Sequence, residues 1–399
     1  MKALLIALGV VVLMGAGMVF LKLPPPAIIV APEIVFHAPG IDITNTMFTS
    51  WFVVAFLLIL GIIAGRGVKL VPSGFSAYIE AAVMALYGIV EQVAGPVNAR
   101  KFFPLVGTIF FFILTSNYFG LLPINNVIGL PEPGHGNTQA VFQQTTVAGI
   151  DLAYMPLKTD SVDVSGGEPA LLPEGYVDPH AAEGHGEEAG GDSHGTEPSS
   201  TPHSAVPAVR SDLTVSRLPA GATVPTAPLA EGEVEHTTDG SFSGILAPYF
   251  RSVNTDINAP LAIAIFSFIF VEFWGLQALG VGYLGKFFAF GALKKGPLGV
   301  IDVFVGLLEL VSEFSRMVSF TFRLFGNIFA GEVLLLMMTF LVPFVLVDAF
   351  YALELFVGLI QAFVFAMLTT VFASMAVTSH GDGDHGEGHG EHMEHAPAH

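Results

Sequence analysis

The chain contains no cysteine, and charged residues are scarce for its length of 399 residues. The absence of cysteine excludes disulfides, thiolate metal sites and cysteine nucleophiles. Charged residues make up only 12% of the chain, whereas about 25% is usual for a soluble domain. Hydrophobic residues make up 52%, and 35 residues are Phe. This balance predicts a protein embedded in lipid.

The formal net charge of −19 is unevenly distributed. Between Asp160 and Glu197 there are ten acidic residues and no Lys or Arg. Much of the acid therefore belongs to segments outside the hydrocarbon of a membrane. An acidic surface of this kind repels nucleic acid, so no nucleic-acid partner is expected.

Long apolar runs alternate with polar segments and predict an all-α integral membrane protein. The predicted parts are an N-terminal apolar anchor or signal segment (1–24), a first membrane part (42–124), an acidic external insertion rich in Gly, Pro and His (125–247), a core membrane part (248–378) and a His-rich cytoplasmic tail (379–399). The first segment fits a cleaved signal peptide and an uncleaved anchor equally well. The insertion is expected to be largely disordered, with short strands where Val and Leu alternate, because it has little apolar surface to offset chain entropy.

The individual membrane spans follow from the apolar runs. The predicted spans cover 48–64, 102–122, 261–284, 298–347 and 349–377, with an amphipathic helix at 73–97 between the first two. The run at 298–347 exceeds one straight crossing, which predicts one long helix that is tilted or bent. Basic residues flank the ends that five spans place on one side: Arg66, Lys69, Arg100, Lys101, Lys286, Lys294 and Lys295. That side is predicted to be cytoplasmic, with the insertion outside and the tail inside.

Arg323 lies within a long apolar segment. Placing Arg at the centre of a membrane helix costs about 2.5 to 3.5 kcal/mol on insertion scales, so it is expected to be functional or paired. Asn327 follows by four residues and shares its helical face, whereas Glu332 follows by nine and points the opposite way. Glu309 precedes it by fourteen residues, close to four turns, and returns to the arginine side.

The last apolar run carries two more polar residues, Glu354 and Gln361, which are seven residues apart and share a face. Gln361 is placed to hydrogen-bond a guanidinium of a neighbouring helix. Carboxylates at Glu309, Glu332 and Glu354 can exchange protons with water lining a cavity. A simpler interpretation is a structural ion pair between a buried Arg and a buried Glu. A lone acid in another span, Glu272, could face a polar crevice or a partner subunit.

The run FRLFGNIFAGE at 322–332 resembles the signature of the F-type ATP synthase a subunit family. Three further segments resemble the family in the same order: TSNYFGLLP at 115–123, SVNTDINAPLA at 252–262 and IQAFVFAMLTTVFASMA at 360–376. The resemblance covers roughly 42–124 and 248–378. It implies the family's fold, with transmembrane helices and a long tilted helical hairpin.

The resemblance also implies site residues for proton translocation. Arg323 matches the essential arginine that faces the rotor ring, and Glu332 and Glu354 match the pair lining the outer half-channel. The remaining matches are Asn327 one turn after the arginine, Ser319 one turn before it, Gln361 near it, and Glu309 and Ser312 on the inner access route.

The function implied by the resemblance is that of the stator a subunit. It would form two half-channels that pass protons to and from the rotating c-subunit ring and so couple the proton gradient to ATP synthesis. The implied partners are the c-ring, the b subunits of the peripheral stalk, the remaining F0F1 subunits and membrane lipid, and the implied location is the bacterial plasma membrane. The chain itself is expected to be no enzyme and to need no cofactor; it has no P-loop motif.

The chain departs from the family pattern in its N-terminal apolar segment, in an insertion from about 131 to 247 and in its His-rich tail. None of these is expected to touch the signature helices. An alternative function is a stand-alone proton or metal-ion permease with His-rich loops. All thirteen His residues lie outside the apolar runs, so the predicted membrane core offers carboxylates, which favour hard ions over soft metals.

Overall fold

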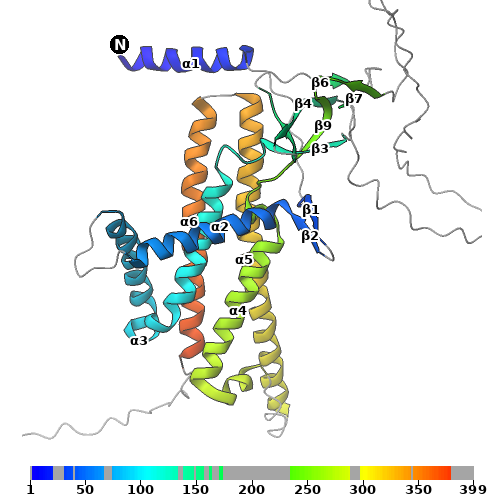
Figure 1. Ribbon diagram of the computed structural model, residues 1–399. Coiled ribbons are helices and arrows are strands. Elements are labelled where there is room, and N and C mark those ends of the chain that lie inside the picture. The colour runs from blue at the N-terminus through cyan, green and yellow to red at the C-terminus, as the bar shows by residue number, and fades with distance from the viewer. Residues whose placement is uncertain are drawn as a thin grey trace, which may run out of the picture. The chain divides into compact units, whose positions relative to one another are not determined.

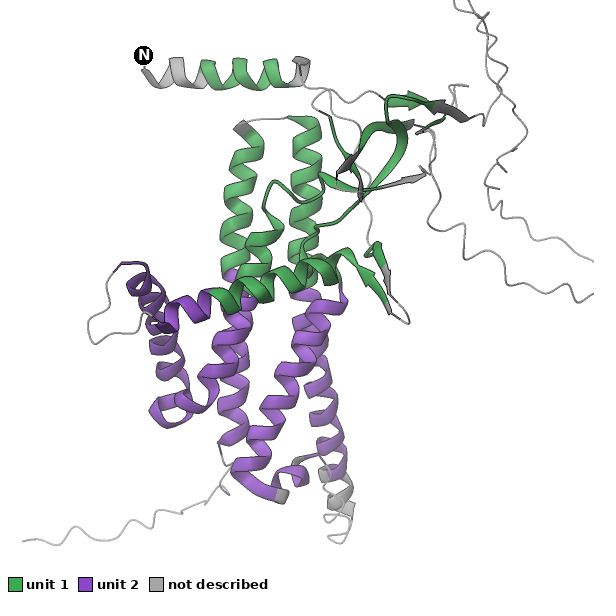
Figure 2. Ribbon diagram, viewed as in Figure 1, with its two compact units in different colours: residues 1–59, 113–256, 325–359 green, residues 60–112, 257–324, 360–399 purple. Residues whose placement is uncertain are grey.

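The computed structural model divides into two compact units, which are described separately (Figure 2). Unit 1 comprises 1–59, 113–256 and 325–359, and unit 2 comprises 60–112, 257–324 and 360–399. Several long helices contribute residues to both units. The structure describes residues 2–20, 31–38, 41–66, 74–133, 138–147, 150–156, 161–163, 170–173, 234–287, 297–342 and 345–378.

Helices dominate the described chain (Figure 1). They are α1 (Lys2–Phe20), α2 (Asn45–Arg66), α3 (Phe75–Gly120), α4 (Asn258–Leu279), α5 (Pro297–Leu341) and α6 (Val345–Val377). Five of them, α2 to α6, are long and apolar enough to cross a membrane. In α1, the described apolar part is the shorter stretch Leu8–Gly17. The predicted helical membrane fold is therefore confirmed, including one continuous helix over most of the run at 298–347.

Helix α3 combines the predicted amphipathic helix and the second predicted span. The two meet at Gly95, whose φ of 76° and ψ of 162° are not helical. Glycine adopts positive φ without the steric cost of a Cβ, and Pro96 directly after it is suited to begin a helix. The break therefore separates the two predicted helices within one element.

Helix α4 ends earlier than the apolar run that predicted it. It stops at Leu279, and Gly280 has a φ of 65°. A 3₁₀ helix, η4 (Gly280–Lys286), then occupies the residues expected to complete the span. Positive φ at Gly280 cannot continue an α-helix, so the backbone conformation ends the element although the sequence stays apolar.

The predicted insertion contains a five-stranded sheet with the strand order β5-β3-β9-β4-β6. Its strands are β3 (Ile128–Pro133), β4 (Thr138–Val147), β5 (Ile150–Tyr154), β6 (Ser161–Asp163) and β9 (Ser241–Pro248), all paired antiparallel. Phe142, Ala153, Phe242 and Leu246 form its small core. The expected short strands are thus present, and the segment 174–233, for which disorder was predicted, lies outside the described residues.

Two smaller strand pairs complete the described β structure. β1 (Ile34–Ala38) and β2 (Ile41–Thr44) form an antiparallel pair that leads directly into α2. β7 (Ala170–Pro173) and β8 (Val234–Thr237) pair in parallel. The pairing of β3 with β9 matters most for the site, because these strands join the end of α3 to the segment before α4.

Candidate functional site

Arg323 lies on α5 in unit 2 with its side chain exposed. Within the described ranges its one hydrogen bond is from Nη2 to Ser319 Oγ, at 3.4 Å on the same helix. Its guanidinium carbon lies 6.0 Å from the ring centre of Phe320. No carboxylate among the described residues forms an ion pair with it. Its permanent positive charge is therefore available to a partner from outside this chain.

The surface of α5 around Arg323 is otherwise mostly apolar. Phe314, Val318 and Phe322 are each more than half exposed. Ser312 and Ser319 are exposed on the same helix, and Glu309 is half-buried. An exposed apolar helix surface that carries one cation suits lipid or another membrane helix as its neighbour.

Gln361 does not form the hydrogen bond with Arg323 that the sequence led us to expect. It is half-buried on α6, next to the buried Ala362, and the described chain contains no hydrogen bond between its amide and the guanidinium. In unit 2 the packing of α5 on α6 is aromatic instead, with Phe320 and Phe365 ring centres 4.9 Å apart. Burying the ring of Phe320 against α6 leaves Arg323, three residues on, with an exposed side chain.

A structural ion pair does exist on α5, but it involves Arg316. Its Nη1 donates to both carboxylate oxygens of Glu313, at 2.8 and 2.7 Å. The Glu313 side chain is almost fully buried, and the guanidinium lies 4.5 Å from the ring centre of Phe372. Sequence reasoning missed this pair, although opposite charges three residues apart in an apolar helix are a recognisable signal. The simpler interpretation, a structural ion pair between Arg and Glu, therefore applies to Arg316 and not to Arg323.

Glu272, the lone acid of α4, also has a neighbour within unit 2. Burial raises the pKa of Tyr283 in η4, and the negative charge and hydrogen bond of Glu272 raise this pKa further. The Tyr283 ring lies over Gly275, where an added Cβ would stand 2.6 Å from it. The early end of α4 thus allows η4 to bring a phenol to the glutamate. Glu272 contacts a partner in its own chain.

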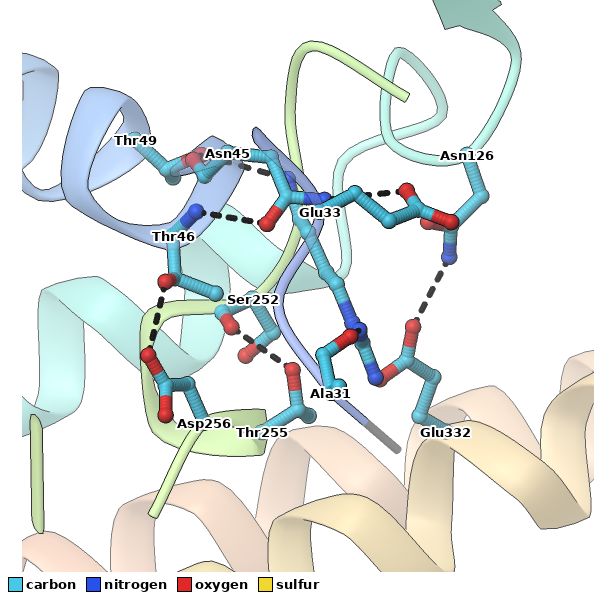
Figure 3. A network of polar contacts seen from close by, with 11 residues as sticks. Ala31, Glu33, Asn45, Thr46, Thr49, Asn126, Ser252, Thr255, Asp256 and Glu332 are labelled. Carbon is cyan, nitrogen blue, oxygen red and sulfur yellow. Dashed lines mark hydrogen bonds and ion pairs between the residues drawn. The ribbon is translucent and has the colours of Figure 1, made fainter. Parts of the chain in front are cut away.

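Glu332 is the centre of a polar network in unit 1 (Figure 3). Asn126 Nδ2 donates to Glu332 Oε1 at 2.9 Å, and Arg251 Nε lies 3.9 Å from Oε2. Both charged side chains are mostly buried, with exposures of 16% for Glu332 and 6% for Arg251. Sequence reasoning identified Glu332 but missed Asn126, at the start of the segment 125–247, and Arg251, shortly after its end, because neither has a periodic signal.

Glu354 lies against the backbone of α5 beside that network. A Cβ added at Gly331 would stand 1.3 Å from Glu354 Oε1, so the carboxylate occupies the space that the glycine leaves open. Because Gly331 directly precedes Glu332, the structure brings the two predicted carboxylates to neighbouring positions in unit 1. Asn327 also belongs to unit 1, and its side chain is exposed.

A second buried polar contact joins α3, α6 and the segment before α4. Asn117 Nδ2 donates to the carbonyl of Gly358 at 3.0 Å, and Asn117 Oδ1 accepts from Asn254 Nδ2 at 2.7 Å. The hydroxyl of Tyr351 on α6 donates to the carbonyl of Leu121. These bonds link the motifs TSNYFGLLP and SVNTDINAPLA, whose order in the sequence says nothing of this contact.

The expectation that residues from about 131 to 247 leave the signature helices untouched stays a prediction, but a residue shortly before this stretch does contact the signature run. Asn126 lies before position 131 and hydrogen-bonds Glu332 of the signature run. The N-terminal side also reaches the network, because the carbonyl of Ala31 accepts from Arg251 Nη1 at 2.9 Å. A linear sequence does not show that β3 and β9 pair down to the ends of the membrane helices, so the insertion looked like a separate appendage.

Metal binding finds no support among the described residues, which contain no cluster of three or more His, Cys, Asp or Glu side chains suited to an ion. The His-rich stretch at 180–203 and the tail at 379–399 lie outside these residues. The helix α1 covers most of the segment 1–24, for which a signal peptide or an anchor is predicted.

Known proteins resemble this chain in its membrane regions. The family model of the ATP synthase A chain matches residues 47–154 and 238–374, more than half of the chain, and omits most of the insertion. ATP synthase subunit a of Helicobacter acinonychis (strain Sheeba) is 37% identical over 132 residues, which are 33% of this chain and 56% of the relative. ATP synthase subunit a of Campylobacter jejuni (subsp. jejuni serotype O:23/36, strain 81-176) is 36% identical over 138 residues, or 34% and 58%.

The match therefore spans little more than half the length of these curated relatives. The family match contains Arg323, Glu332 and Glu354, together with Asn126 and Arg251 of the polar network. Five helices long enough to cross a membrane agree with a multi-pass membrane protein. This chain belongs to the ATP synthase A chain family.

Proposed function

We propose that this chain is the stator a subunit of an F-type ATP synthase and that it passes protons to and from a rotating c-subunit ring. The observation that carries the proposal is the exposed, permanently charged Arg323 on an apolar surface of α5. Within the described chain no carboxylate neutralises it. Such a charge in a membrane requires an acidic partner, which the described residues do not supply.

A ring of acids that moves past Arg323 meets this requirement. A neutral carboxyl group can face lipid, whereas an isolated carboxylate in hydrocarbon is very unfavourable. Arg323 gives each ring carboxylate one place to ionise, and guanidinium stays protonated when desolvated. The exposed Phe314 and Phe322 beside it present an apolar surface to the ring. The same cation separates the two access routes and so prevents protons from leaking directly between them.

The remaining site residues divide between these access routes. Glu332 and Glu354, adjacent in unit 1, line the outer half-channel in this proposal. Glu309 and Ser312 line the inner route, while Ser319, Asn327 and Gln361 surround the arginine. Moving one charge through 100 mV releases about 2.3 kcal/mol, so several steps per turn supply torque for ATP formation by other subunits. This chain contributes the path and performs no reaction on nucleotide.

The proposed partners are the c-ring, the b subunits of the peripheral stalk and the remaining F0F1 subunits, in a bacterial plasma membrane. The Helicobacter and Campylobacter relatives support the bacterial assignment. The basic residues Arg66, Arg100, Lys101 and Lys286 support the orientation, because they flank the ends that five spans place on one side. We infer that the insertion is external and the tail cytoplasmic.

Replacement of Arg323 tests the proposal directly. In membrane vesicles that contain the assembled complex, Arg323→Ala and Arg323→Lys should abolish ATP-driven proton pumping. Arg100→Ala is the matched control, because Arg100 is an exposed arginine on a different helix, α3. Normal pumping by Arg323→Ala would refute the proposal. Purification separates the alternative, since a stand-alone permease would be isolated without a c-ring and stalk.

A further inference from the structure

The polar network around Glu332 depends on parts of the chain that lie outside the membrane helices. The antiparallel pairing of β3 and β9 runs from Pro133 opposite Gly244 to Gly129 opposite Pro248. It continues through two hydrogen bonds, from Tyr249 N to the carbonyl of Ile128 at 3.0 Å and from Asn126 N to the carbonyl of Phe250 at 3.3 Å. We call strands β3 and β9 with this extension the ribbon.

The ribbon sets the backbone of Asn126. This residue has a φ of 59°, and in the described chain it is the one non-glycine residue with positive φ. Asparagine tolerates this left-handed conformation better than most residues. Its N–H is held by Phe250, and its side-chain amide points to Glu332 of α5 (Figure 3). The backbone of Asn126 is therefore held by Phe250, independently of the hydrogen bond between its side-chain amide and Glu332.

Arg251 is held in place independently of Glu332. Its backbone N–H donates to Thr49 Oγ1 on α2 at 3.1 Å, and its Nη1 donates to the carbonyl of Ala31 at 2.9 Å. The segment that contains Ala31 is tied to α2 in turn, because Asn45 N donates to the carbonyl of Glu33 at 2.9 Å. The N-terminal segment and α2 thus fix the guanidinium beside Glu332.

The two oxygens of Glu332 consequently differ. Oε1 accepts the short hydrogen bond from Asn126. Oε2 is buried, accepts no hydrogen bond from any described residue, and lies 3.9 Å from Arg251 Nε, beyond hydrogen-bonding distance. Buried carboxylate oxygens usually accept a hydrogen bond, so an oxygen that accepts none is a candidate for a functional role.

We propose that Asn126 is a positioning residue that holds Glu332 Oε1, so that Oε2 is the atom that takes up and releases the proton in the outer half-channel. The inference rests on the proposed function. Oε2 forms an O–H bond with a proton from water on the outer side and gives the same proton up toward the ring, while Arg251 faces the carboxylate left behind. The ribbon built from the insertion is what keeps this orientation.

Two substitutions at one position separate positioning from folding. Asn126→Gly keeps access to positive φ and removes the amide, and Asn126→Asp keeps the shape but places an anion against Glu332. We expect ATP-driven pumping per assembled complex to fall roughly tenfold in the Gly variant, as suits a lost hydrogen bond to a charged group, and further in the Asp variant. Thr145→Ala, at an exposed position on β4, should pump normally.

A double-mutant cycle with Glu332→Gln shows whether Asn126 acts through Glu332. In the slower Glu332→Gln background, both Asn126 variants should have no further effect on pumping. A reduction by the same factor in both backgrounds, or normal pumping by Asn126→Gly and Asn126→Asp, would overturn the inference. If Asn126→Asp does not assemble, the Gly variant alone decides the outcome by the same criterion.

The parallel Arg323→Ala measurement keeps the two proposals apart. If Arg323→Ala abolishes pumping but the Asn126 variants pump normally, this inference is wrong and the proposed a-subunit function is unaffected. Pumping that survives Arg323→Ala would refute the function itself, and with it the inference. Gly129→Ala supplies a change in the ribbon alone, because its Cβ would stand 2.0 Å from the carbonyl oxygen of Ala247. We expect this variant to slow pumping only when Glu332 is present.

Discussion

The carboxylate of Glu354 on α6 fills the space above Gly331 on α5, the residue that directly precedes Glu332. This contact is possible because glycine has no Cβ, and it brings the acid of one helix to the backbone of the other. The two carboxylates of the proposed outer half-channel, Glu332 and Glu354, consequently lie near each other because Gly331 has no side chain.

Gly331→Ala should therefore impair pumping by displacing Glu354, since the new methyl group would stand 1.3 Å from its Oε1. Alanine favours helix over glycine by about 1 kcal/mol, so helix propensity opposes this loss. Gly61→Ala on α2 is the matched control, because its Cβ would meet nothing within 4 Å. Pumping rates normalised to assembled complex are the measurement, and equal rates for both variants would contradict the close contact.

The two arginines of α5 should respond differently to removal. Arg316→Ala leaves Glu313 buried without its cation, and breaking a buried pair in this way costs about 3 to 5 kcal/mol, an upper figure here because Arg316 is partly exposed. Arg323→Ala removes an exposed charge with no ion-pair partner in the described chain and should leave stability almost unchanged. Thermal inactivation of the detergent-solubilised complex distinguishes them, and comparable losses would contradict the assignment of roles.

Tyr283 should stay protonated at pH values where other tyrosines ionise, because burial and Glu272 raise its pKa. The folded protein then binds a proton that the unfolded chain has released, so the stabilisation is complete below about pH 10, the ordinary tyrosine value, and declines as pH rises above it. Phenolate absorbance measured during an alkaline titration should show a late-titrating phase whose amplitude Tyr283→Phe reduces. An identical titration by the variant would contradict this prediction.

The register of the ribbon can be verified by cross-linking, because the natural chain has no cysteine. Leu130 lies opposite Ala247, so Leu130→Cys with Ala247→Cys should form a disulfide on mild oxidation. Leu130→Cys with Leu246→Cys is the control, since neighbouring strand residues point to opposite faces. Mass spectrometry of the digested protein detects the linked peptides. Cross-linking of the second pair in preference to the first would indicate a different register.

Much of the membrane fold could be predicted from local sequence. A chain in lipid must satisfy its backbone hydrogen bonds within each span, so an apolar run of sufficient length predicts a helix without reference to its neighbours. Arg323 was identified for the same reason, because the cost of its charge depends on the apolar residues beside it. The end of α4 was misplaced, since a single positive φ at Gly280 ends the helix within an apolar run.

The sequence by itself determined the apolar spans, the family signature and the presence of Arg323 within an apolar run, because each depends on residues close together in the chain. Only the tertiary structure decided what surrounds Glu332. Asn126 precedes it by 206 residues, and the two meet because β3 pairs with β9 in one register. Many alternative strand pairings have similar local propensity. No short pattern in the sequence could therefore predict this pairing.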